Sequence, residues 1–290
     1  MSKYYCLIAG LPSISLDDSK LAYSVEGFKA EIETILTDGD RKLVRLFFLK
    51  YDNANLLSYL RKGSVSEFDA RGEFSGEDIR EICNMLKSED RTPQNIAVPA
   101  YFVAFIREYY SRFEETENFG TVLPEDKLSA LYYDEAVKCE NAFLASWFEM
   151  NLNIGNVMAA LNCRKYGLAK EDYIVGNNEI AEQLRQSNAR DVNPRSSFDY
   201  MAELMRIVEE SDLLTREKQL DALRWNWLEE NTFFKTFDIE SVVTYILRLE
   251  MIERWSGLDR IEGEKTFRSL VTEMKRESAE TLDEFKENNK

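Results

Sequence analysis

Apolar residues recur at intervals of three and four along most of the chain, which is the spacing of one face of an α-helix. Ile79, Ile82 and Leu86 form one such stripe. Ser75 and Asp78 stand just before it in the arrangement of a capping box, which favours a helix start. The pattern therefore predicts an amphipathic helix that begins at this serine.

Two prolines are expected to open the next helices, because proline is favoured in a first turn. Pro124 begins a long helical pattern, which we expect to run to Lys165 and to end at Gly167, with an interruption at residues 151–155. Pro99 begins a shorter helix with an aromatic-rich apolar side that consists of Phe102, Phe105, Ile106, Tyr109 and Phe113.

The rest of the chain continues in the same manner. Residues 198–208, 220–227 and 238–255 keep the helical period, and residues 265–290 are so highly charged that we expect a solvated helix. Residues 4–8 are compatible with a strand but too few to decide by periodicity. The chain has only 12 glycines and 5 prolines, too few for a sandwich or barrel with a turn every ~8–12 residues. The sequence thus predicts an all-α fold.

Composition excludes several classes of function. None of the 290 residues is histidine, which removes Ser-His-Asp and Cys-His catalysis and the common zinc sites. The net charge of −16 argues against nucleic acid as a partner. Paired acidic residues such as 114–115 and 229–230 are expected in any chain this acidic, and no nucleotide-binding glycine motif is present. We therefore predict no catalytic residue, no cofactor and no metal.

The four cysteines are scattered, which is typical of free thiols in a reducing compartment. No stretch approaches ~18 uncharged apolar residues, so we expect a soluble, cytoplasmic protein.

A weak internal repeat joins two segments, 47–61 and 148–162. At a spacing of 101 residues, Asn55 aligns with Asn156, and Asp52 with Asn153. In a fainter third segment Glu250 and Glu253 keep the three-residue step of Asp52 and Asn55, and Arg254 follows. Chance alignment of amphipathic helices is one explanation. The other is three equivalent units, either stacked as a solenoid or closed around an axis.

Residues 140–167 and 237–266 resemble two segments of the C-type subunits of V-type and A-type rotary ATPases, whose eukaryotic members are called d-type. In the first segment an acidic residue, an aromatic one, an apolar run with asparagines and a basic helix end follow in the family's order: Glu140, Trp147, Leu152, Asn153, Asn156, Val157, Arg164, Lys165 and Gly167. Asn153 replaces the family's usual acidic residue. In the second, the matching positions are Tyr245, Glu250, Glu253 and Arg254.

The resemblance implies an all-α funnel of three similar helical units of about 100 residues. We expect them at residues 1–95, 96–195 and 196–290, the last with a charged C-terminal helix, in one compact body. It also implies a non-catalytic central-stalk subunit at the inner membrane face. Its partners would be the coiled-coil rotor shaft and the membrane proteolipid ring.

Eight residues are candidates for contacts with these partners: Asn55, Arg61, Asn156, Arg164, Lys165, Glu250, Glu253 and Arg254. The asparagines and Glu253 could instead cap or cross-link helices, and the basic residues near helix ends could instead balance the helix dipole. Two other functions stay open. A helical-repeat adaptor unrelated to ATPases would form an open stack, and an all-helical enzyme would need a pocket of carboxylates with raised pKa values.

Overall fold

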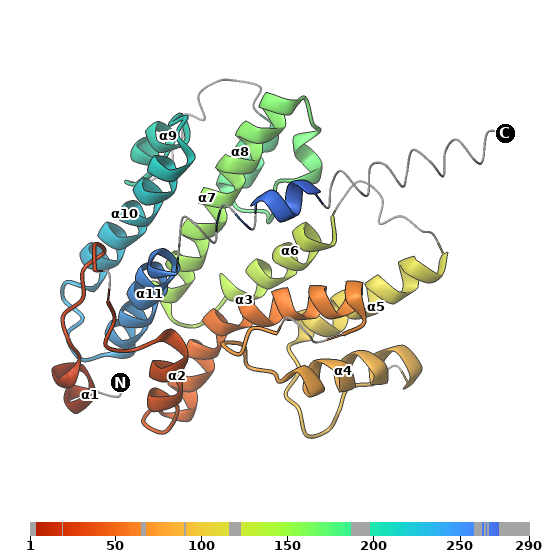
Figure 1. Ribbon diagram of the computed structural model, residues 1–290, viewed down its shortest axis with the longest axis horizontal. Helices are drawn as coiled ribbons and strands as arrows, with labels where there is room; N and C mark the ends of the chain where they lie inside the picture. Colours follow the sequence, from red (N-terminus) through yellow and green to blue (C-terminus); the bar gives the residue numbers. More distant parts are fainter. Residues whose placement is uncertain are drawn as a thin grey trace.

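The computed structural model describes residues 4–18, 20–64, 68–89, 91–115, 123–186, 198–257, 263, 265 and 267–272. The fold is all-helical, as predicted, and no strand occurs among these residues (Figure 1). The elements in chain order are α1 (Tyr5–Gly10), α2 (Val25–Glu33), α3 (Asp38–Lys62), α4 (Gly76–Glu89), α5 (Ala100–Glu115), α6 (Pro124–Ala136), α7 (Ala142–Tyr166), the 3-10 turn η1 (Lys170–Asp172), α8 (Glu179–Gln186), α9 (Met201–Val208), α10 (Leu213–Thr232) and α11 (Ile239–Ser256).

The predicted capping box begins α4. The backbone N–H of Asp78 donates to Ser75 Oγ at 3.2 Å, and the backbone N–H of Ser75 donates to the Asp78 carboxylate at 2.8 Å. Helix α5 follows Pro99 as expected, and α7 ends at Gly167, whose φ of 69° is the left-handed conformation that suits glycine. These local signals were therefore sufficient to predict the helix ends.

The expected single helix from Pro124 to Lys165 is two helices. The break lies between Ala136 and Ala142, where the Asn141 side chain caps α7 by accepting the backbone N–H of Leu144 at 3.1 Å. The interruption expected at residues 151–155 is absent, and this part of α7 is continuous. The asparagines there are compatible with a helix because their side chains find partners, as Asn151 does by donating to the Trp147 carbonyl at 2.9 Å.

Two further expectations concern the ends of the chain. The segment at residues 4–8 is not a strand, because Tyr5–Gly10 form the short helix α1. Most of the charged segment at residues 265–290 lies outside the described residues, and residues 267–272 are helical.

The buried side chains form two clusters that share α7. The larger lies among α2 to α6, α11 and the first turns of α7, and the smaller lies among α8, α9, α10 and the rest of α7. Phe47 of α3 stacks on Phe148 of α7 with ring centres 4.9 Å apart, and Trp227 of α10 contacts both clusters. Helix α7 is therefore the element that joins the two parts of the core.

Successive helices pack against each other in two groups. Helices α3, α4, α5 and α6 contact one another in turn, as do α7, α8, α9 and α10, while α11 packs on α10 and α2. Closure into a funnel and the unit boundaries near residues 95 and 195 stay predictions.

The three long helices α3, α7 and α11 begin at the same end of the molecule. Tyr4 connects two of the starts, since its backbone N–H donates to the Phe237 carbonyl at 2.8 Å and its hydroxyl donates to Asp40. Asn141 connects the third, because its amide donates to Glu240 at 3.2 Å. From this end α3 and α7 run in different directions in Figure 1. Among the described helices, none combines the length and apolar character needed to cross a membrane.

Candidate functional site

The aligned asparagines of the repeat make the same contact in α3 and α7. Asn55 donates its amide to the Asp69 carbonyl at 3.0 Å and accepts the Asp69 backbone N–H at 2.9 Å. Asn156 does the same with Val175, at 2.7 and 2.8 Å. Each buried side chain therefore binds both backbone polar groups of one residue in the loop that follows its helix. A recurrence of this kind is more than a shared amphipathic pattern.

The third position of the repeat has a related contact. Glu253 of α11 accepts the backbone N–H of Val25, the first residue of α2, at 3.2 Å. A carboxylate can accept but cannot donate, so only half of the asparagine contact is possible here. All three aligned side chains thus hold a backbone segment against a long helix.

Asp52 and Asn153, aligned one turn before the asparagines, differ in chemistry. Asp52 is fully buried and accepts the backbone N–H groups of Glu73 and Phe74 at 2.8 to 3.0 Å. Burial raises the pKa of this carboxyl to about 6, although the two N–H groups and Lys29 oppose the change. Asn153 instead donates to the Tyr200 hydroxyl at 3.0 Å.

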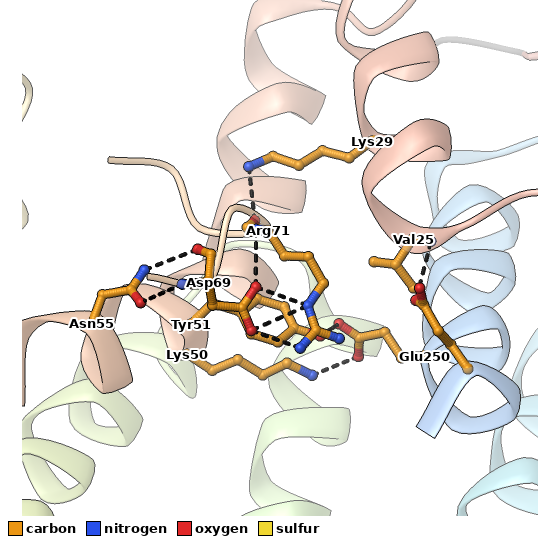
Figure 2. A network of polar contacts seen from close by, with 9 residues as sticks. Val25, Lys29, Lys50, Tyr51, Asn55, Asp69, Arg71 and Glu250 are labelled. Atoms are coloured by element: carbon orange, nitrogen blue, oxygen red, sulfur yellow. Dashed lines mark hydrogen bonds and ion pairs between the residues drawn. The ribbon is translucent and has the colours of Figure 1, made fainter. Parts of the chain in front are cut away.

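The loop after α3 is held from several directions (Figure 2). Besides the contacts to Asn55 and Asp52, the Lys29 ammonium binds the carbonyls of Arg71 and Gly72 at 3.0 and 2.5 Å. Within the loop Arg71 pairs with Asp69 at 2.6 Å. The pair lowers the pKa of the Asp69 carboxyl and fixes the Arg71 guanidinium over the ring of Tyr51, 4.2 Å from its centre. This loop therefore places a cation beside α3.

A cavity of about 730 Å³ lies where the three long helices meet. We call it the central cavity. All three long helices line it, together with α6, α10 and the loop after α3. Its lining residues are Phe47, Lys50, Tyr51, Arg71, Tyr132, Tyr133, Trp147, Phe148, Asn151, Asp221, Arg224, Leu247, Glu250, Met251, Glu253 and Arg254. Aromatic rings and charged groups therefore share one wall.

Glu250 organises one side of the central cavity. Its carboxylate accepts the Lys50 ammonium at 2.5 Å and the Tyr51 hydroxyl at 2.7 Å, so it joins α11 to α3 (Figure 2). Burial and the negative charge of Glu250 raise the pKa of Tyr51, which keeps the hydroxyl protonated and available as a donor.

Asp221 organises the other side. This buried carboxylate binds Arg224 at 3.1 Å, Arg254 of α11 and the indole N–H of Trp255 at 2.8 Å. Arg224 in turn donates to Asn151 of α7 at 2.9 Å. The charged groups of the wall are thus engaged with one another across three helices, an arrangement that fixes helices and favours binding over proton transfer.

The structure separates the eight candidate residues into two sets. Glu250, Glu253 and Arg254 line the central cavity, whereas Asn55 and Asn156 do not and instead hold loops. The other three, Arg61, Arg164 and Lys165, lie near the far ends of α3 and α7. Arg61 pairs there with Glu125 of α6, and Lys165 lies over the Tyr166 ring. Their contact with a partner stays a prediction.

Sequence reasoning missed five charged or hydroxyl-bearing residues of the cavity wall: Lys50, Tyr51, Arg71, Asp221 and Arg224. Lys50 and Tyr51 stood inside the first repeat segment, next to Asp52, and that position was a signal for them. Asp221 and Arg224 belong to α10, outside the repeat, and the sequence offered no sign that they approach α11.

Comparison with known families gives one match. The family model described as "Protein of unknown function (DUF2764)" matches residues 1–278. The chain belongs to this family. No curated protein matches the chain.

Proposed function

We propose that this DUF2764 protein is a non-catalytic central-stalk subunit of a V-type rotary ATPase that couples the rotor shaft to the membrane proteolipid ring. The observation that carries the proposal is the shared equipment of α3, α7 and α11. They begin together, each uses an aligned polar side chain to hold a backbone segment, and all three line the central cavity. The sequence resemblance supplies the identity of the machine.

The contacts of the cavity wall suit a mechanical role. A torque-transmitting adaptor needs helices that do not slide, and the pairs centred on Glu250 and Asp221 connect α11 to α3 and α10. Stacked rings such as Phe47 and Phe148 add stiff contact between α3 and α7. In this proposal the shaft end occupies the central cavity.

The test is binding of the purified protein to the coiled-coil shaft subunit and to the detergent-solubilised proteolipid ring of the same organism. Binding to both supports the proposal. Absence of both, with protein that is folded by circular dichroism, contradicts it.

A charge reversal tests the position of the shaft. Lys50→Glu places a second carboxylate beside Glu250 in the cavity wall and should weaken shaft binding at least about tenfold. Lys42→Glu, an exposed position on the same helix that does not line the cavity, is the control and should bind normally. Equal binding of both variants would place the shaft elsewhere.

One observation favours a second candidate, a helical-repeat adaptor unrelated to ATPases. The groups α3–α6 and α7–α10 follow one another along the chain, with the same asparagine contact in each, as in stacked repeats. A folded protein that binds neither shaft nor ring would favour this candidate.

A further inference from the structure

Two adjacent phenylalanines stand exposed in the turn between α10 and α11. Phe233 is 74% exposed and Phe234 is 89% exposed, and their rings contact each other edge to face with centres 4.9 Å apart. Burying a phenylalanine side chain is worth roughly 1.5–3 kcal/mol, so such exposure is costly unless a partner covers it.

Helix α1 adds to the same surface. Tyr5, 54% exposed, lies against Phe237 with ring centres 4.5 Å apart, and the Phe237 carbonyl accepts the backbone N–H of Tyr4. No residue of α1 is buried. We call Tyr5, Phe233 and Phe234 the aromatic tip. It lies at the end where the three long helices begin, outside the central cavity.

The charges near the tip point to one kind of occupant. Glu229 and Glu230, in the last turn of α10, are exposed, whereas the nearby Lys235 pairs with Glu240 at 3.4 Å. An acidic border repels an anionic bilayer and attracts lysine and arginine side chains. The matching surface is therefore an apolar groove on a protein, edged by basic residues.

We propose that the aromatic tip is the docking surface for the proteolipid ring, through an apolar groove with basic edges on the ring's exposed loops. This inference rests on the proposed function. In that function two partners need separate surfaces, and the shaft takes the central cavity, so the tip is available to the ring.

The experiment compares ring binding and shaft binding of two double variants. Phe233→Ser/Phe234→Ser removes the tip. Leu213→Ser/Leu214→Ser removes two equally adjacent apolar residues, 62% and 55% exposed, at the opposite end of α10, roughly 30 Å away along the helix. Both pairs are exposed, so both variants should melt at the temperature of the unmodified protein.

The tip variant should bind the detergent-solubilised ring at least about tenfold more weakly and the shaft normally. The control variant should bind both normally. Equal ring affinity of the tip variant and the unmodified protein would overturn the docking surface and leave the proposed function intact. Failure of the unmodified protein to bind either partner would overturn both proposals.

Vesicles of phosphatidylcholine alone provide a separate arm, because a neutral bilayer could also accept exposed aromatic rings. The unmodified protein should not sediment with them. Sedimentation that the Phe233→Ser/Phe234→Ser change abolishes would assign the tip to lipid and overturn the ring as its occupant.

Discussion

At the scale of single residues, Gly72 shows how closely the loop after α3 approaches that helix. A Cβ added at Gly72 would lie 2.3 Å from Asp52 Oδ1, whereas a Cβ at Gly39, in the first turn of α3, would meet nothing within 4 Å. Gly72→Ala should therefore lower the free energy of unfolding by about 2 kcal/mol, while Gly39→Ala leaves it unchanged or raises it by up to ~1 kcal/mol. Urea denaturation followed by circular dichroism measures both, and an unchanged midpoint for Gly72→Ala would contradict the close contact.

Asp52 gives the fold a dependence on pH. Its pKa is about 6 when folded and 3.8 as the ordinary value, so the folded protein binds the proton more tightly than the unfolded chain. The resulting stabilisation is fully present below pH 3.8 and is lost as the pH rises through about 6. The difference between the two pKa values corresponds to about 3 kcal/mol.

Asp52→Asn should remove this component. Whatever its effect at a single pH, the variant should lack the decline in unfolding free energy that the unmodified protein shows between about pH 4 and pH 7 because of this carboxyl. Urea titrations at several pH values measure the decline. Asp199→Asn, at an exposed position, is the control and should keep it. The same decline in Asp52→Asn would show that another group is responsible.

At the scale of elements, the asparagine contacts determine how a loop follows its helix. Asn156→Ala would leave the buried backbone groups of Val175 without their partner and should cost about 2–3 kcal/mol. Hydrogen exchange of residues 168–178 should accelerate as well, because the loop loses its connection to α7. Asn226→Ala, on the exposed side of α10, should change neither quantity. A loss of stability without faster exchange in the loop would argue against the role of this contact.

The helix ends show what local sequence can and cannot predict. The capping box at Ser75 and the glycine end of α7 depend on residues a few positions apart, and both were predictable. The interruption expected near Asn151 was wrong, because a helix-disfavouring residue is tolerated once its side chain finds a partner. For Asn153 and Asn156 these partners lie 19 to 47 residues away, so local propensity carried no sign of them.

At the scale of the whole molecule, the repeat could be detected but the cavity could not. The alignment of Asn55 with Asn156 is visible in the sequence, and it correctly pairs two positions that make equivalent contacts in α3 and α7. The cavity wall depends on pairs such as Lys50 with Glu250, 200 residues apart, and Asp221 with Arg254. Nothing local distinguishes these residues from the many other charged side chains on the surface of an acidic chain.

The charge of the whole chain leads to the last prediction. At −16, the protein should bind its partners partly through its acidic surface, and Glu229 and Glu230 place part of that charge beside the aromatic tip. The ring complex should therefore weaken as salt rises from about 50 to 500 mM, because screening shortens the range of attraction to basic side chains. Glu229→Gln/Glu230→Gln should reduce the dependence on salt, whereas Phe233→Ser/Phe234→Ser should lower affinity at every salt concentration and leave the dependence unchanged. Isothermal titration across this range separates the two effects, and a complex insensitive to salt would contradict the electrostatic role.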